Sequence, residues 1–569
     1  MITEPDKFTM TNMTKASIWS PGYFALLFCT GISVILVLFY FYIIKPYVLL
    51  PADILMWGET DFVGNIIKIR NGSPIYTPPG DSNSLVYTPG APLLTYLISW
   101  FFGKTTSIAF LRAIQLGYVT CAAIVATSCL KMLHKISFPD HLIPFPKTWT
   151  IFSFLVFFLA ATSPRINAFS HCLHLDALAI LISMFCFWAT LRYLKSPGWG
   201  NLFLMAVCPA LGYLVKQFLI SWSALIFIFL LLLHPRDIKR LIIFTLTAAA
   251  LIAVAMGSCY LLWGDNFIFW TFEVMGGSRA KITVMPSVNH ISLVRSLDHV
   301  VRAWMELLIG FIGGYWVLRK NNIKKLGPLW IAWILLITSE AFSSGAGWAV
   351  LYHFGPGVLI GVIWLFVAVI RFWPFAKESP QGIFPIYSYW IRPIVAVIVI
   401  ITLFVVLHVV PTADENEGRY YKRRPPADTY RYIADIEKEF EGMPVEKVLL
   451  DIGNWTYLKQ SYLAKDRAVS LADQPLGGIY ENLDVFVDRI RQKTYGKILV
   501  RDFYSPYFLY DYIHWEKPSG VKKALLEYYR EVRTIPGIEG DTSHRLGIMH
   551  SGSISVFVPK KETGEDIEI

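Results

Sequence analysis

Two acidic residues just beyond the first long apolar run are the first candidates for chemistry. Glu59 and Asp61 stand in the stretch "DILMWGETDFVGNIIKIRNGSPIYTPP". Carboxylates at the start of a helix complement its dipole, which is the structural explanation. Acidic groups beside an apolar wall are costly, however, and tend to mark functional sites. Because such surroundings raise the proton affinity of a carboxylate, we predict that Glu59 or Asp61 is a general base that takes a proton from a hydroxyl.

Two basic residues follow a glycine pair in the predicted loop 264–300. Arg279 and Lys281 come directly after "MGGS". A flexible loop with two cations suits a lid over a phosphate-bearing substrate. Binding of anionic lipid headgroups explains the same residues equally well.

The composition shows what kind of protein must position these residues. Of the 569 residues, 55% are hydrophobic and only 16% are charged, and the mean hydropathy is +0.48. Soluble domains contain about 25% charged residues. The chain is therefore predicted to be an α-helical, polytopic membrane protein, and disorder, a coiled coil and a disulfide scaffold are excluded.

The net charge of +10 is unevenly distributed. Residues 412–569 hold about 23 Lys and Arg against about 26 Asp and Glu, which leaves about 28 against 15 in the first 411 residues. The basic excess lies between apolar runs rather than on a soluble face, so it indicates membrane topology and no nucleic-acid partner. None of the seven cysteines has metal-binding spacing.

Eleven apolar runs are long enough, or nearly so, to cross a bilayer. They lie at 22–44, 108–131, 148–163, 173–192, 200–215, 217–233, 241–263, 301–318, 326–341, 348–370 and 392–411. With a cytoplasmic N-terminus, the short basic loops all fall on the inner side. We therefore expect residues from 412 onward on the outer side, most simply in the periplasm of a bacterial cell envelope with the body in the inner membrane.

The chain divides into a transmembrane body (1–411), a linker (412–426) and an extracytoplasmic α/β domain (427–569). Within the first outer loop, 45–107, an amphipathic helix that includes residues 62–70 is expected to lie in the membrane interface. The apolar run 91–102, of about twelve residues, is too short to span the bilayer and is expected to lie flat there as well. The C-terminal domain is predicted to contain strands at 445–453, 468–473, 496–503 and 553–560, and helices at 428–440, 481–492 and 520–532.

The first outer loop carries a resemblance to a known family. An acidic residue after the first span, an amphipathic helix, "NGSPIY" and "YTPGAPLLTYLISWFFG" resemble the GT-C superfamily of membrane glycosyltransferases, closest to the branch of aminoarabinose transferase and the protein O-mannosyltransferases. The family pattern is matched by Glu59, Phe62, Gly72, Tyr76, Pro89 and Pro92. It departs at the acidic pair, where Gly58 replaces the usual Asp and Asp61 follows two residues after Glu59.

The resemblance implies a glycosyltransferase that moves a sugar from a polyprenyl-phosphate donor to a hydroxyl of a lipid, glycan or protein, with inversion. It implies that Lys216 contacts the donor phosphate, and a buried lysine does need an anion, although a snorkelling lysine is the alternative. It also implies that Tyr352 and His353 line the cavity, although a packed core histidine is the simpler explanation.

The resemblance further implies a divalent metal ion, Mg or Mn, beside the donor phosphate. Asp176 and His174 lie two residues apart and could both reach such an ion or position the donor. The alternative is that Asp176 caps the fourth span and His174 lies among the headgroups.

A secondary transporter or flippase of an amphiphilic substrate is the main alternative function. Transporters usually contain paired halves with broken helices near the membrane midplane, and no such halves are visible in the sequence. Phosphate-loop, Rossmann, HExxH and GxSxG motifs are also absent, so nothing supports ATP-driven transport. A non-catalytic scaffold or sensor is a third reading, which predicts no dependence on Glu59 or Asp61.

Overall fold

The computed structural model describes three parts of the chain. The first is 21–274, with gaps at 52, 54–58, 79–83, 139–146, 164–165, 168–169 and 171. The second is 293–372, with gaps at 303, 320–322 and 345–353. The third comprises 427–451 without 440 and 444–446, 484–504 without 502, 520–537 and 553–560.

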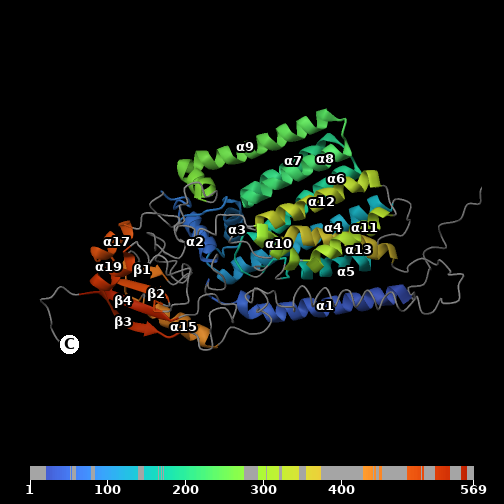
Figure 1. Cartoon of the computed structure of the whole chain (residues 1–569). Coiled ribbons are helices and arrows are strands. Elements are labelled where there is room, and N and C mark those ends of the chain that lie inside the picture. Colours follow the sequence, from blue (N-terminus) through green and yellow to red (C-terminus); the bar gives the residue numbers. More distant parts are fainter. Residues whose placement is uncertain are drawn as a thin grey trace, which may run out of the picture.

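Long apolar helices form the body of the protein (Figure 1). Among the described residues, five helices are long and apolar enough to cross a membrane, which makes the chain a multi-pass membrane protein. They are α1 (Pro21–Val48), α4 (Ile108–Ser137), α6 (Asp176–Lys195), α9 (Ile238–Ile268) and α12 (Ile323–Ser344). Shorter apolar helices pack among them: α5 (Lys147–Ala161), α7 (Trp199–Val215), α8 (Ser221–Leu233), α11 (Trp304–Arg319) and α13 (Gly355–Phe372). Ten of the eleven predicted segments thus coincide with helices, and the eleventh, 392–411, lies outside the described residues.

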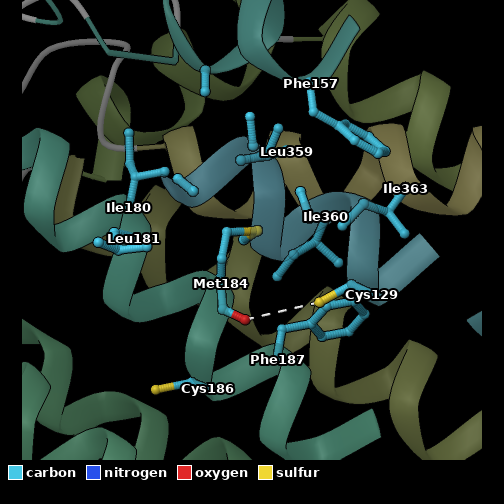
Figure 2. Packing of buried hydrophobic residues seen from close by; sticks show 14 of the residues in the cluster. Cys129, Phe157, Ile180, Leu181, Met184, Cys186, Phe187, Leu359, Ile360 and Ile363 are labelled. Carbon is cyan, nitrogen blue, oxygen red and sulfur yellow. Dashed lines mark hydrogen bonds between the residues drawn. The ribbon is translucent and has the colours of Figure 1, made fainter. Parts of the chain in front are cut away.

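Buried apolar side chains of α4, α5, α6 and α13 pack together in the interior of the bundle. Figure 2 shows Cys129 of α4 and Met184 of α6 within this layer, surrounded by Phe157, Ile360 and Ile363. The Cys129 thiol points at the carbonyl oxygen of Met184, 3.9 Å away. Because these helices are buried on most sides, they form a rigid frame for the residues at their ends.

Helices α1 and α9 lie at the edge of the bundle instead. Large apolar side chains stand exposed on both, among them Ile35 and Leu38 on α1 and Leu261 and Leu262 on α9. In a membrane protein such faces contact lipid tails. Helix α9 continues through Gly264, whose φ of 59° only glycine adopts without strain, into the π-helical turn η3 (Phe269–Val274).

The first outer loop contains the two predicted short helices, α2 (Glu59–Arg70) and α3 (Gly90–Phe101). Both contain 12 residues, and they pack against each other at one end of the bundle (Figure 1). Between them, residues 75–77 and 85–87 pack on the end of α9: the Trp270 indole donates to the Thr77 carbonyl at 2.7 Å, and the Tyr76 hydroxyl donates to the Tyr87 carbonyl at 2.6 Å.

Helix α3 begins in close contact with the end of α7. A Cβ added at Gly90 would lie 2.5 Å from the Leu214 carbonyl oxygen, two residues before Lys216. We expect Gly90→Ala to push α3 away from α7 and to destabilise the protein by about 1–3 kcal/mol. Gly117→Ala in α4 is the matched control, because nothing lies within 4 Å of its added Cβ. Equal thermal unfolding of the two variants in detergent would contradict this contact.

The C-terminal part contains a four-stranded sheet at the same end of the bundle as α2 and α3 (Figure 1). Its order is β1 (Val448–Asp451), β2 (Lys497–Arg501), β4 (Ile554–Pro559) and β3 (Tyr529–Ile535); β1 and β2 are parallel and the other pairs antiparallel. Helices α15 (Ala427–Lys438), α17 (Asp484–Arg491) and α19 (Val521–Tyr528) accompany it.

The last four residues of one predicted helix of this domain, 529–532, belong to a strand instead. The helix expected over 520–532 ends at Tyr528, and the chain continues directly as β3. The amphipathic pattern continues past the end of the helix, but residues from Tyr529 to Ile535 pair with β4 instead. Tyr529 and Ile535, the two ends of β3, are buried in this sheet. The strand predicted at 468–473 lies outside the described residues.

Candidate functional site

A buried ion pair fixes the start of α2. Nε and Nη2 of Arg112, on α4, donate to the two carboxylate oxygens of Glu59, each at 2.8 Å. Both side chains are fully buried. Two parallel charge-assisted hydrogen bonds of this kind also restrict orientation, so the pair locks α2 against α4.

The same pair connects two further segments. Nη1 of Arg112 donates to the carbonyl oxygens of Tyr47 (2.9 Å) and Leu50 (2.6 Å), at the end of α1. The backbone N–H of Leu173 donates to Glu59 Oε1 at 3.1 Å. Glu59 therefore accepts three hydrogen bonds and joins the first outer loop to the segment that leads into α6.

A second ionic cluster begins directly after Leu173. Asp176, the first residue of α6, contacts His174 Nδ1 through Oδ2 at 2.7 Å and Lys216 Nζ through Oδ1 at 2.9 Å. The side chains of His174, Asp176 and Lys216 are 7%, 9% and 18% exposed. Three residues that the sequence analysis assigned to donor or metal binding are thus brought together, and Lys216 is the most accessible of them.

The backbone explains why Lys216 is available. It has an extended conformation (φ −155°, ψ 126°) between α7 and the 3-10 turn η2 (Gln217–Ile220). Burial alone would lower the pKa of Lys216, but attraction to Asp176 outweighs it, so the pKa lies above its ordinary value and the side chain is a cation. An anion can therefore bind here without a proton being supplied.

The next residue fixes this break in the helix. The Gln217 side-chain amide donates to the carbonyl oxygens of Val86 (3.1 Å) and Thr271 (3.4 Å). It thereby links the approach to α3 and the turn η3 to the position of Lys216. The interfacial helices, the ends of α6 and α7 and the end of α9 all contribute to one candidate site.

Sequence reasoning missed two members of the site. Arg112 is a cation inside an apolar span, a placement that requires a partner and could have been paired with an acid in the neighbouring loop. Asp53 is fully buried just beyond α1 and close enough to Arg112 for their charges to interact. Like Glu59 and Asp61, Asp53 is an acid beside apolar helices, where a carboxylate is costly and tends to mark a functional site.

The remaining predicted residues cannot be placed in this geometry. Asp61 lies in the first turn of α2, where its side chain is not among those described. Arg279, Lys281, Tyr352 and His353 lie outside the described residues. Their roles stay predictions.

The side chains of Asp176 and His174 do not suit a divalent metal ion. Both oxygens of Asp176 contact nitrogen atoms, and His174 turns Nδ1 toward Asp176. Among the described residues, no three or more His, Cys, Asp or Glu side chains gather as a metal site. Mg²⁺ prefers an octahedron of oxygen ligands. Asp176 and His174 in this arrangement therefore do not fit the predicted Mg or Mn ion.

Comparison with known proteins gives the class of fold. No family model and no curated protein sequence matches the chain. Solved structures do match, and they show that the fold resembles that of an archaeal oligosaccharyltransferase.

Two of these structures come from Archaeoglobus fulgidus. One is the archaeal oligosaccharyltransferase AglB in complex with an inhibitory peptide and a dolichol-phosphate; its TM-score is 0.51 at 10% identity, covering 95% of this chain and 88% of that one. The other is the oligosaccharyltransferase in the apo form, with a TM-score of 0.51 at 12% identity, covering 92% and 74%. At this identity the match establishes the fold alone, and both the GT-C superfamily and its aminoarabinose transferase-like branch remain predictions.

Proposed function

We propose that the chain is a glycosyltransferase that transfers a sugar from a polyprenyl-phosphate donor to a hydroxyl on the outer face of the membrane. The observation that carries the proposal is the cation of Lys216, held by Asp176 in a break between apolar helices, next to the acidic first outer loop of a GT-C fold. The AglB structure, which contains a dolichol-phosphate, supports a donor of this chemical class.

In the proposed reaction, Lys216 binds the donor phosphate and stabilises the negative charge that grows on it as the bond from the anomeric carbon to the phosphate oxygen breaks. The phosphate leaves with the bonding electrons. The acceptor oxygen forms the new bond from the opposite face, which inverts the anomeric carbon. The predicted roles of Arg279 and Lys281 as further phosphate-binding cations, and of Tyr352 and His353 as cavity residues, belong to the proposal and concern residues outside the described ones.

A carboxylate of the first outer loop takes the proton of the acceptor hydroxyl. Glu59 and Asp61 are the candidates from the sequence, and Asp53 joins them because it is buried at the same place. The three hydrogen bonds that Glu59 accepts favour a positioning role for it. We therefore assign the base to Asp61 or Asp53, with Asp176 and His174 holding Lys216.

The proposal is tested with purified protein and radiolabelled prenyl-phosphate pentoses and hexoses, with a membrane extract as the source of acceptor. We expect transfer by the wild type, and a loss of about 10²–10⁴-fold on Asp61→Asn or Asp53→Asn for the residue that is the base. Both variants should retain wild-type donor binding, because neither residue is assigned to the phosphate.

Two outcomes would contradict the proposal. Full transfer by the triple variant Asp53→Asn/Glu59→Gln/Asp61→Asn would remove the loop carboxylates from the reaction. Movement of the intact donor across vesicle membranes without transfer would identify the protein as a flippase.

A further inference from the structure

A cluster of basic residues occupies the end of the bundle opposite the candidate site. Helix α6 begins at Asp176 in the site and ends at Lys195, and its 20 residues span about 30 Å at 1.5 Å per residue. The starts of α7 and α9 and the end of α8 lie at this same far end (Figure 1). We call the group the far-end basic cluster; it consists of Arg192, Lys195, Arg236, Lys239, Arg240 and the indole of Trp199.

The charges of this cluster are poorly balanced. Among the described residues of 192–201 and 234–240, five Lys and Arg side chains face one acid, Asp237. Asp237 forms an ion pair with Arg240 at 2.8 Å. Lys195, Arg236 and Lys239 are exposed. The cluster therefore carries a net positive charge close to the level of the lipid headgroups.

Arg240 is held in place at the centre of the cluster. Its Nη1 donates to the Tyr193 hydroxyl at 2.8 Å and lies 3.5 Å from His234 Nε2. Burial and, after it, the Arg240 charge lower the pKa of His234, so the imidazole is neutral at pH 7 and adds no charge. Because Tyr193 and Asp237 already hold the Arg240 guanidinium, its side chain loses little conformational entropy when an anion binds.

Two cations meet at one aromatic ring. The Lys239 ammonium lies 5.8 Å from the centre of the Trp199 ring, and the Arg240 guanidinium lies 5.9 Å from it. Trp199 itself is 53% exposed at the start of α7. The two cations repel each other, and a bound anion would offset this repulsion. Exposed tryptophans at helix ends are typical of the headgroup region of a membrane.

We propose that the far-end basic cluster binds the phosphate of one anionic phospholipid, with Lys239 and Arg240 on the phosphate and Trp199 beside the glycerol backbone. The exposed apolar residues next to the cluster, Leu231, Leu232 and Ile238, contact the acyl chains. Basic pockets between transmembrane helices bind anionic headgroups in this way. The inference is independent of the proposed enzymatic function.

The test is a titration of delipidated protein with phosphatidylglycerol, followed by native mass spectrometry. We expect phosphatidylglycerol to bind more tightly than phosphatidylcholine, and Lys239→Gln to weaken it by about fivefold, as one lost basic contact predicts. Lys135→Gln is the matched control, because Lys135 is exposed in the last turn of α4 at the same end of the bundle, outside the cluster.

Three results would overturn the proposal: equal affinity for the two lipids, equal weakening by the two substitutions, or displacement of the lipid by millimolar inorganic phosphate, which would identify a site for the free ion. Lys239 is exposed, so both variants should fold, and their unfolding temperatures in neutral lipid should match the wild type.

Discussion

Replacing Lys216 with methionine should lower kcat/KM for sugar transfer by about 10²–10³-fold, the loss typical of removing one donor that stabilises charge in a transition state. Lys216 is the only member of its cluster more than a tenth exposed, and its ammonium lies 2.9 Å from the carboxylate that holds it. Methionine retains most of the length and apolar character of the side chain but removes the positive charge. The measurement is the rate of transfer from a labelled prenyl-phosphate sugar.

Two further variants separate the charge from folding. Lys216→Arg keeps a cation and should recover part of the lost activity, whereas Lys135→Met, at the opposite end of the bundle, should leave the rate unchanged. Because Lys216→Met leaves Asp176 with His174 as its remaining ionic contact, we also expect a lower unfolding temperature for this variant. Wild-type transfer by Lys216→Met would refute the phosphate-binding role.

Replacing Arg112 with methionine should destabilise the protein by about 3–5 kcal/mol, because it leaves the Glu59 carboxylate buried without its counterion. Arg112 is fully buried and also supplies the hydrogen bonds to the carbonyl groups of Tyr47 and Leu50. Equilibrium unfolding in mixed micelles is the measurement, with Lys131→Met, an exposed position on the same helix, as the control.

The double variant Arg112→Met/Glu59→Gln tests the ion pair itself. Removing both charges should restore a large share of the lost stability, because the Glu59 carboxylate is then no longer buried without its counterion. A double variant no more stable than Arg112→Met would show that the carbonyl contacts of Arg112, rather than Glu59, account for its effect.

Glu59→Gln alone distinguishes positioning from catalysis at that residue. A positioning role predicts that stability and transfer fall together, since Arg112 then loses the carboxylate of Glu59 and Leu173 loses a charged acceptor. A wild-type unfolding temperature with no transfer would instead make Glu59 the base.

The helices were largely predictable from the sequence, because apolar runs of about 20 residues have few alternatives to a membrane helix. Even the two short helices of the first outer loop were predictable, the first from its amphipathic spacing and the second from an apolar run too short to cross a bilayer. The change from α19 to β3 was not predictable in this way, since it depends on pairing with β4, which is distant in sequence. Its boundary falls between two adjacent tyrosines, Tyr528 and Tyr529, which give no local stop signal.

The candidate site was predictable in its residue types and less so in its pairings. His174, Asp176 and Lys216 were each identified, yet the sequence suggested a metal ion for the first two and a phosphate for the third, and the structure joins all three. The partner of Glu59 lies 53 residues away on another helix. The structure identifies this pairing. It favours a positioning role for Glu59 over the proton transfer that the sequence predicted.

The length of α9 has a consequence for how substrates reach the site. Its helical geometry is broken at Gly264, and the part before this kink, residues 238–263, extends about 39 Å, whereas the hydrocarbon core is about 30 Å thick. Beyond the kink, the turn η3 contacts Thr77 through Trp270 and Gln217 through Thr271. Phe267 and Trp270 are buried there against residues 75–76 and 85–87 and form an apolar wall on one side of the site. A lipid-borne donor and a water-borne acceptor would then approach the site by different routes. The donor would come through the bilayer, and the acceptor would come through water, past this apolar wall.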